Sequence, residues 1–423
     1  MSEVGKTLIG RPDVDVSIIM PCLNEAGCLP ACIANAREAL QMMRASYGLS
    51  GEIVIADNGS TDGGPAIAES LGARCIHVTR RGYGAALAGG ATAAYGRFLV
   101  MGDADGSYDF RDAVAMVGRL MQGADLCMGS RFQGGIEPGA MPWKNRYIGN
   151  PILTGILNIL FRAGISDAHC GIRALTRSTF DRLQLSGDGM EFASEMVIKA
   201  ALLGCAIAEV PATLSRDLRD RPPHLRPWRD GWRHLRYLLM LSPTWLFAAP
   251  GVIFAGLALA ILALAGVDAV QGAPSYVGNY WVILAGGLLT VAHSALLLAA
   301  AGNLYGVREG YRRHSDWSKT FARWVSLEMM LIAGAVCVLA GGGILAGVLG
   351  YWSAQRFVPL LNVLPAVLGT SLLVIGAQNI LGGFLIAIVN GNDADFVRPA
   401  PLPASAAMVQ ASPASRLVPN EVA

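Results

Sequence analysis

Four long apolar runs without Asp, Glu, Lys or Arg occupy the second half of this 423-residue chain. Each exceeds the roughly 20 residues that a helix needs to cross a bilayer. Four buried helices of one soluble core would rarely follow one another in this way, so we predict four transmembrane helices. The runs are Thr244–Val267, Trp281–Val307, Met329–Gln355 and Phe357–Asn392, the last of which Pro359 and Pro365 are able to shorten or break.

The composition agrees with a membrane-bound chain. Charged residues make up only 15% of the sequence and hydrophobic residues 53%, whereas soluble proteins carry about 25% charged residues. The polar surface is too small to cover two soluble cores, which excludes a wholly cytosolic protein and a disordered chain. The net charge is only +2, so we expect no nucleic-acid partner.

Basic residues cluster on one side of the apolar runs. The positive-inside rule therefore predicts a multi-pass integral membrane protein with its N-terminal half and both termini in the cytoplasm, in the inner membrane if the source is bacterial. The tail from residue 393, rich in Pro, Ala and Ser, is predicted to be disordered. The basic residues are Arg216, Arg219, Arg221, Arg226, Arg229, Arg233 and Arg236 before the first run, and Arg308, Arg312, Arg313, Lys319 and Arg323 after the second, against Arg356 alone on the opposite side.

Two smaller features carry little chemistry. The eight cysteines form no Cys-x-x-Cys pair and match no zinc spacing, so we interpret them as structural thiols in a reducing compartment. The N-terminus does not resemble a signal peptide.

His293 lies inside the second apolar run. It is either a functional intramembrane group or a neutral histidine bonded between helices, and we favour the second interpretation.

The first half alternates short β-branched runs with stretches of helical character. The runs VSIIMP, EIVIAD, RCIHVT and RFLVMGD are predicted strands, with helices expected at Glu25–Met43, Gly64–Leu71 and Tyr83–Tyr95. This alternation predicts an α/β domain with a mainly parallel, doubly wound sheet. Ligands of such sheets bind beyond the carboxyl ends of the strands.

Asp103 and Asp105, in GDADGSYD, follow the fourth predicted strand. An isolated Asp-x-Asp is usually a solvated turn, but this position favours a site for Mg²⁺ or Mn²⁺, which binds one or two carboxylates together with diphosphate oxygens. The glycine-rich stretch RRGYGAALAGG lacks the GxGxxG spacing of a dinucleotide site. It either admits a phosphate to a helix N-terminus or allows close helix packing.

Taken in order, the motifs of the first half resemble family-2 glycosyltransferases, in particular the polyisoprenyl-phosphate branch typified by dolichol-phosphate mannosyltransferase. The resemblance covers roughly residues 16 to 236 and depends on the ordered set, since each motif is weak singly. The motifs are Pro21-Cys-Leu-Asn24-Glu25, Asp57-Asn-Gly-Ser60-Thr-Asp62, Arg81-Gly82-Tyr83-Gly84, Asp103-Ala-Asp105, Gly129-Ser130-Arg131, Arg146 to Asn150, Asp167-Ala-His-Cys-Gly171-Ile-Arg173, and Glu209-Val-Pro211 with Arg216.

The resemblance implies a glycosyltransferase A-type, Rossmann-like catalytic domain over residues 1–212. A basic juxtamembrane segment with interfacial helices would follow at 213–243, then a helical membrane domain at 244–392 and a cytoplasmic tail at 393–423. The implied reaction is inverting, metal-dependent transfer of a hexose from a UDP- or GDP-linked sugar to a dolichyl- or undecaprenyl-type phosphate. Its lipid-linked product would serve glycan or cell-envelope assembly.

The resemblance also implies roles for individual residues. Ser107 stands where relatives often have Gln, and Cys170–Arg173 stands where they often have Ser-Gly-Phe-Arg, so both positions depart from the family pattern. The implied sets are catalytic Asp105, Arg131, Arg146 and Arg173; nucleotide-sugar-binding Pro21, Asn24, Glu25, Asp57, Ser60, Arg81, Gly84 and Asp103; metal-binding Asp103, Asp105 and Ser107; and acceptor-phosphate-binding Arg131, Arg146, Asn150, Arg173 and Arg216.

Other interpretations stay open at this point. A polysaccharide synthase would typically show Gln-x-x-Arg-Trp, which is absent. A transferase acting on another lipid, and a transporter with a nucleotide-sugar sensor domain, are further alternatives.

Glu195 is either a catalytic or a structural carboxylate. The stretch Leu214–Arg236 carries seven Arg against three Asp and favours an interfacial helix in its last part. Trp143–Arg162 is either a second interfacial helix or a core-facing one. The oligomeric state is not determined, a homo-oligomer included.

Overall fold

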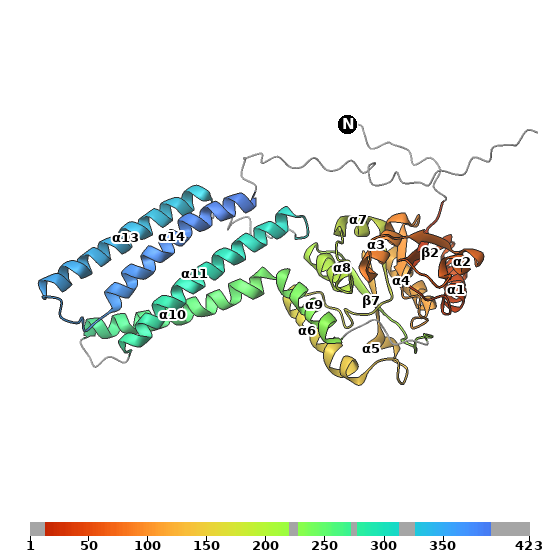
Figure 1. Ribbon diagram of the computed structural model, residues 1–423, viewed down its shortest axis with the longest axis horizontal. Helices are drawn as coiled ribbons and strands as arrows, with labels where there is room; N and C mark the ends of the chain where they lie inside the picture. The colour runs from red at the N-terminus through yellow and green to blue at the C-terminus, as the bar shows by residue number, and fades with distance from the viewer. Residues whose placement is uncertain (1–12, 220–226, 272–276, 313–325, 391–423) are drawn as a thin grey trace, which may run out of the picture.

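The computed structural model describes residues 13–219, 227–271, 277–312 and 326–390 (Figure 1). A domain built on a β-sheet lies at one end of the molecule, and a bundle of long helices extends from it. Several predicted features fall outside the described residues: the tail at 393–423, and Arg221, Arg226, Arg313, Lys319 and Arg323.

The first domain contains a seven-stranded sheet with the order β3-β2-β1-β4-β6-β5-β7. Strand β6 runs antiparallel to β4 and β5, and the other pairs are parallel. The predicted mainly parallel sheet and its four predicted strands are therefore confirmed. The strands are β1 Val16–Cys22, β2 Gly51–Asp57, β3 Arg74–His77, β4 Phe98–Met101, β5 Leu126–Ser130, β6 Arg173–Thr176 and β7 Ile207–Pro211.

Helices cover both faces of this sheet. Alternate residues of β1 face opposite ways: Ile18 joins the apolar cluster that contains residues of α1 and α4, and Ile19 joins the cluster that contains residues of α3, α6 and α8. Both side chains are fully buried. The helices are α1 Leu29–Tyr47, α2 Gly64–Ser70, α3 Tyr83–Ala93, α4 Ala113–Met121, α5 Arg131–Gly134, α6 Asn150–Phe161, α7 Arg177–Leu183 and α8 Glu191–Leu202, with short helical turns η1 Phe110–Asp112 and η2 Asn145–Gly149.

Helix α1 begins later than the sequence predicts. Its first residue is Leu29 rather than Glu25, and a proline occupies the first turn. Asn24 adopts a left-handed backbone conformation with a φ of 58°, which a helix cannot continue through. The residues from Leu23 to Gly27 are thereby left to form a loop at the carboxyl end of β1.

The second half forms four helices that are long and apolar enough to cross a membrane. The four predicted transmembrane helices are confirmed on that basis. The fourth begins at Leu364, with Pro365 in the first turn, where its missing N–H breaks no helical hydrogen bond. The elements are η3 Thr244–Ala248 continuing into α10 Ala249–Gln271, then α11 Asn279–Arg308, α13 Leu327–Ala354 and α14 Leu364–Asn390.

Helices α13 and α14 pack through glycines. A Cβ added at Gly341 would lie 2.6 Å from the carbonyl oxygen of Gly369, and one added at Gly376 would lie 2.6 Å from that of Gly334. Any larger side chain would therefore meet backbone of the neighbouring helix. Close backbone approach at small residues is the usual way in which helices associate in lipid, where burial of apolar side chains supplies little driving force.

Helix α9, Pro227–Met240, joins the two halves and contacts α6 and α8 (Figure 1). Its His234 and Leu238 are buried, whereas Trp232 is 61% exposed. Helix α6 is divided in the same way, since Leu157 is buried and Ile152 and Ile159 are exposed. The segment Trp143–Arg162 thus has both a core-facing side and an exposed apolar side.

Candidate functional site

Asp57 ends strand β2 and organises the loop that follows. Its carboxylate accepts hydrogen bonds from the backbone N–H groups of Gly59 (3.1 Å) and Ser60 (2.9 Å), and lies 3.1 Å from Nδ1 of His77. Burial tends to raise the pKa of Asp57, but the bonds from Ser60, His77 and Gly59 outweigh it and hold the pKa below its ordinary value. A buried carboxylate is thus kept ionised at the carboxyl end of the sheet.

The loop after β1 is cross-linked to the loop after β2. The side-chain oxygen of Asn24 accepts from Thr61 N at 2.8 Å, and the Ser60 hydroxyl accepts from Asn24 N at 2.9 Å. Asp62 accepts from Ala26 N at 2.8 Å. The residues assigned by resemblance to the nucleotide-sugar therefore gather at one edge of the sheet.

The glycine-rich stretch closes on the same edge. Arg81 donates to the backbone carbonyl oxygen of Asn58. Gly82 N donates to the side-chain Oδ1 of Asn58 at 2.8 Å. A Cβ at Gly84 would lie 2.3 Å from the carbonyl oxygen of Gly187. The approach of the loop around Gly187 therefore explains the glycine at position 84 in this structure.

Asp103 lies immediately beyond strand β4. Its Oδ1 accepts from the hydroxyl of Tyr83 at 2.9 Å, and a Cβ at Gly171 would lie 2.7 Å from its Oδ2. Burial, and then the charge of Asp105, raise the pKa of Asp103 to about 6. Tyr83 was not among the predicted site residues, although its position in the Arg-Gly-Tyr-Gly motif was a usable signal.

Asp105 is held through both carboxylate oxygens. Oδ1 accepts from the backbone N–H and the hydroxyl of Ser107, at 2.9 and 2.6 Å. Oδ2 lies 2.5 Å from Nη2 of Arg219. In this structure Ser107 orients Asp105, and Arg219 neutralises it.

The donor set at Asp103 and Asp105 suits a hard divalent cation. The described residues contain no group of three or more His, Cys, Asp or Glu side chains arranged to hold a metal ion. Mg²⁺ and Mn²⁺ do not need such a group when a diphosphate supplies further oxygens. Two carboxylates at the end of a strand fit that kind of shared site.

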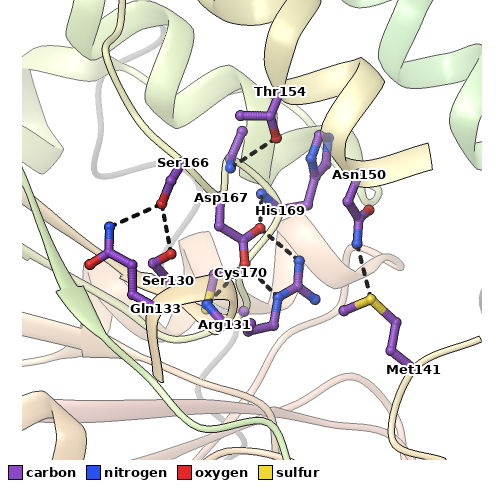
Figure 2. Close-up of polar contacts among 12 residues, drawn as sticks. Ser130, Arg131, Gln133, Met141, Asn150, Thr154, Ser166, Asp167, His169 and Cys170 are labelled. Atoms are coloured by element: carbon purple, nitrogen blue, oxygen red, sulfur yellow. Dashed lines mark hydrogen bonds and ion pairs between the residues drawn. The ribbon is translucent and has the colours of Figure 1, made fainter. Parts of the chain in front are cut away.

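On the predicted acceptor side, Arg131 faces Asp167 (Figure 2). Their two contacts are 2.7 Å from Nε to Oδ2 and 2.8 Å from Nη2 to Oδ1, and both side chains are buried. Burial alone would raise the pKa of Asp167, but the hydrogen bonds and charge of Arg131 lower it. Bidentate geometry of this kind is the strongest form of Arg–carboxylate pairing. Asp167 was part of a quoted motif but was given no role from the sequence.

The other predicted acceptor residues differ in exposure. Arg173 is 2% exposed and donates to the carbonyl oxygens of Ala193 and Cys170. Arg216 is exposed and donates to the carbonyl oxygen of Pro138 at 2.6 Å. Arg146 is partly exposed and stacks over Tyr147, and Asn150 donates to the sulfur of Met141.

Two acceptor-side segments directly contact the loop Asp103–Ser107, which we call the DxD loop. Gly171 packs beside Asp103. Ser215 N donates to the Ser107 carbonyl at 2.9 Å, and Leu218 N donates to that of Asp105 at 2.8 Å. Within the described part of the chain, Arg146 and Asn150 make no hydrogen bond or ion pair with Asp103 or Asp105.

Glu195 and His293 differ in their partners. Glu195 accepts from Gly187 N at 2.7 Å and lies 2.8 Å from Nζ of Lys199. Burial would raise its pKa, but the contacts with Lys199 and Gly187 lower it. His293 of α11 faces Asn379 of α14, and its Nε2 is buried without a hydrogen-bond partner among the described residues. The contacts of Glu195 favour its structural interpretation.

The chain matches two protein-family models. "Glycosyl transferase family 2" matches residues 17–184, and "Glycosyltransferase family 2 C-terminal transmembrane region" matches residues 300–390. The first lies on the sheet and the DxD loop, and the second on three of the long apolar helices. The matches therefore fall on both halves of the molecule.

Three curated proteins illustrate what the chain is similar to. It is 37% identical over 393 residues to the low-salt glycan biosynthesis hexosyltransferase Agl6 of Haloferax volcanii, covering 90% of this chain and 92% of that protein. It is 30% identical to the polyprenol monophosphomannose synthase of Mycolicibacterium smegmatis, over 48% of this chain and 79% of that one. It is 29% identical to the dolichyl-phosphate hexose transferase of Haloferax volcanii, over 47% and 81%.

Proposed function

The chain belongs to glycosyl transferase family 2, and on that premise we propose that it transfers a hexose from a nucleotide-sugar to a polyisoprenyl phosphate. The active site would face the cytoplasm, as the basic residues around the apolar helices favour. The lipid-linked product would serve as a sugar donor for glycan assembly. Two relatives carry names with polyprenol or dolichyl phosphate in them, which supports this acceptor class.

The direct contact between the DxD loop and the segments beyond it carries this proposal. Ser215 and Leu218 donate backbone hydrogen bonds to that loop, and Gly171 packs against Asp103. These contacts support one continuous site, in which the loop assigned to the donor diphosphate lies beside the segments that carry the residues assigned to the acceptor phosphate. Helix α9 packs against α6 and α8 and is followed by the first membrane helix, so a lipid phosphate would reach the site from the bilayer surface.

Two anions have to meet for this reaction. A phosphate monoester is ionised at neutral pH, so the acceptor oxygen is already nucleophilic and needs no strong general base. The protein's task is to reduce the repulsion between the acceptor phosphate and the donor diphosphate. Charge-assisted and bidentate contacts from arginines do this well. Arg146 and Arg216 are the partly or fully exposed candidates, while Arg131 and Arg173 are buried.

On the donor side, Asp103 and Asp105 would hold Mg²⁺ or Mn²⁺, which stabilises negative charge on the departing nucleoside diphosphate. Ser107 keeps Asp105 oriented through two hydrogen bonds. Asp57, Asn24 and Ser60 would border the nucleoside, held by bonds within and between their two loops. In-line attack of the acceptor oxygen at the anomeric carbon would invert its configuration.

A donor and acceptor screen tests the proposal. Purified full-length protein in nanodiscs would be given UDP- and GDP-linked hexoses, each with a short polyprenyl phosphate, with diacylglycerol or with no lipid. We expect a lipid-linked sugar and free nucleoside diphosphate only with polyprenyl phosphate, and a product whose anomeric configuration is opposite to that of the donor. Product with diacylglycerol alone would assign another lipid acceptor. Nucleotide-sugar binding without turnover would favour a sensor domain instead.

A further inference from the structure

Arg219 lies within reach of three carboxylates at the DxD loop. Its guanidinium nitrogens are 2.5 Å from Asp105 Oδ2, 3.1 Å from Asp217 Oδ2 and 3.6 Å from Glu25 Oε1. The side chain is 15% exposed. The guanidinium of Arg219 therefore offsets the negative charge of Asp105, which is assigned to the metal, and of Glu25, which is assigned to the nucleotide-sugar. It also offsets the charge of its near neighbour Asp217.

The main chain places Arg219 there. The segment Ser215–Arg219, which we name the arginine strap, lies along the loop Asp105–Ser107 and makes two backbone hydrogen bonds to it, at 2.9 and 2.8 Å. The side chain of Leu218 covers Gly106, where an added Cβ would lie 2.7 Å from Leu218 Cδ1. The packing of the arginine strap therefore holds Arg219 against Asp105. Arg219 is not a free surface side chain.

The pairing with Arg219 occupies the Asp105 oxygen that a metal would use. Ser107 takes Oδ1 with two hydrogen bonds, which leaves Oδ2 as the oxygen shared with Arg219. A divalent cation at normal ligand distance from Oδ2 would come close to the guanidinium, and the two positive charges would repel each other. Arg219 and the metal therefore cannot bind Asp105 Oδ2 at the same time with the contact that each would make alone.

Arg219 also has a donor to spare. Its Nε is buried and has no hydrogen-bond partner among the described residues. A buried N–H without an acceptor is costly, and a diphosphate oxygen is an acceptor that Arg binds well. The nucleotide would therefore give the guanidinium a new anionic partner as the metal takes the carboxylate.

We propose that Arg219 and the divalent cation exchange at Asp105: Arg219 neutralises the carboxylate before loading, and the metal displaces it when the nucleoside diphosphate arrives. This inference rests on the proposed function, since it requires the metal site at Asp103 and Asp105. It predicts that the metal binds weakly alone and more tightly with the nucleotide. Because Arg219 ends the strap, the exchange would also connect donor loading to the acceptor-side segment.

Mn²⁺ binding, followed by electron paramagnetic resonance on full-length protein in nanodiscs, tests the exchange without turnover. Without nucleotide, Arg219→Gln should bind Mn²⁺ about tenfold or more tightly than the parent, because a competing charge-assisted contact is gone. With UDP or GDP present the difference should shrink or reverse. Arg219→Lys, which keeps the charge but cannot bridge Asp105 and Asp217 in the same way, should fall between the two.

The matched control is Arg111→Gln, which removes an arginine that pairs with Asp109, just past the same loop. It should leave Mn²⁺ affinity unchanged. Equal or weaker Mn²⁺ binding by both Arg219 variants, with the parent binding Mn²⁺ normally in the presence of nucleotide, would overturn the exchange and leave the proposed function standing. Absence of Mn²⁺ binding in every protein, with and without UDP or GDP, would overturn the metal site and the exchange together.

Discussion

The catalytic half and the membrane half of this molecule stabilise their interiors in different ways. The catalytic half buries charges in matched pairs, such as Arg131 with Asp167 and Lys199 with Glu195. The α13–α14 contact of the membrane half depends on the absence of side chains, since Gly341 and Gly376 meet backbone of the neighbouring helix. A charge-removing change should therefore harm the first half most, and a volume-adding change should harm the second.

The largest effect is expected at the DxD loop. Asp105→Ala should lower transfer about a thousandfold or more, because it removes a proposed metal ligand and the partner of Arg219. The protein should stay folded and membrane-bound, as judged by its elution profile and its extraction behaviour. The measurement is the rate of lipid-linked sugar formation at saturating donor.

Asp109→Asn is the control for that change. Asp109 lies in the same stretch of chain but pairs with Arg111 and caps η1, so transfer should fall by less than about threefold while stability decreases slightly. Full activity in Asp105→Ala would remove Asp105 from the metal site.

The buried ion pair comes next. Arg131→Ala leaves the Asp167 carboxylate buried without its bidentate partner, which should lower the free energy of unfolding by about 3–5 kcal/mol. It should also raise the KM for polyprenyl phosphate, because the loop that carries the proposed acceptor motif loses its anchor. Thermal unfolding of the nanodisc-bound protein and acceptor titration measure the two effects.

Arg146→Ala separates these two contributions. Arg146 is partly exposed and stacks on an exposed tyrosine, so its removal should change stability by less than about 0.5 kcal/mol while still raising the acceptor KM. An effect of Arg131→Ala on nucleotide affinity alone would show that the acceptor site lies elsewhere.

In the membrane half, Gly341→Val should destabilise the α13–α14 contact by about 1–3 kcal/mol, because the new side chain meets the backbone of Gly369. The neighbouring Gly342 is the matched control, since an added Cβ there meets nothing within 4 Å. Gly342→Val should leave the unfolding temperature unchanged. Equal destabilisation by both variants would mean that helix propensity, and not close packing, is responsible.

The smallest effect concerns pH. Burial, and then the nearby His234, lower the pKa of His169 to about 3, with Arg131 and Arg173 also lowering it and Asp167 opposing them. The folded protein keeps this ring neutral, whereas the unfolded chain takes up a proton below about pH 6.5. Stability from this group is thus complete above pH 6.5 and is lost as the pH falls toward 3, by at most about 1.4 kcal/mol per unit.

His169→Gln should remove part of that dependence. Between pH 7 and 5 its unfolding temperature should fall less steeply than that of the parent protein, measured in nanodiscs at constant ionic strength. Parallel curves for the two proteins would show that His169 does not contribute to acid sensitivity.

The sequence determined the division of the molecule and much of its local structure. Hydropathy fixed the four apolar helices, because a long charge-free run has few other stable conformations. The alternation of β-branched runs with helical stretches predicted the first four strands and the mainly parallel sheet. The start of α1 was wrong, because the left-handed conformation of Asn24 depends on bonds to a loop far along the chain.

Only the tertiary structure decided which charges are partners. Arg131 and Asp167 are 36 residues apart, and Arg219 and Asp105 are 114 residues apart, so no local pattern connects them. From the sequence, Arg219 was one of seven arginines in a basic segment and Arg216 was the one assigned to the site. The strap's hydrogen bonds to the DxD loop selected Arg219, because a charged side chain acts on whatever the backbone brings within a few ångströms of it.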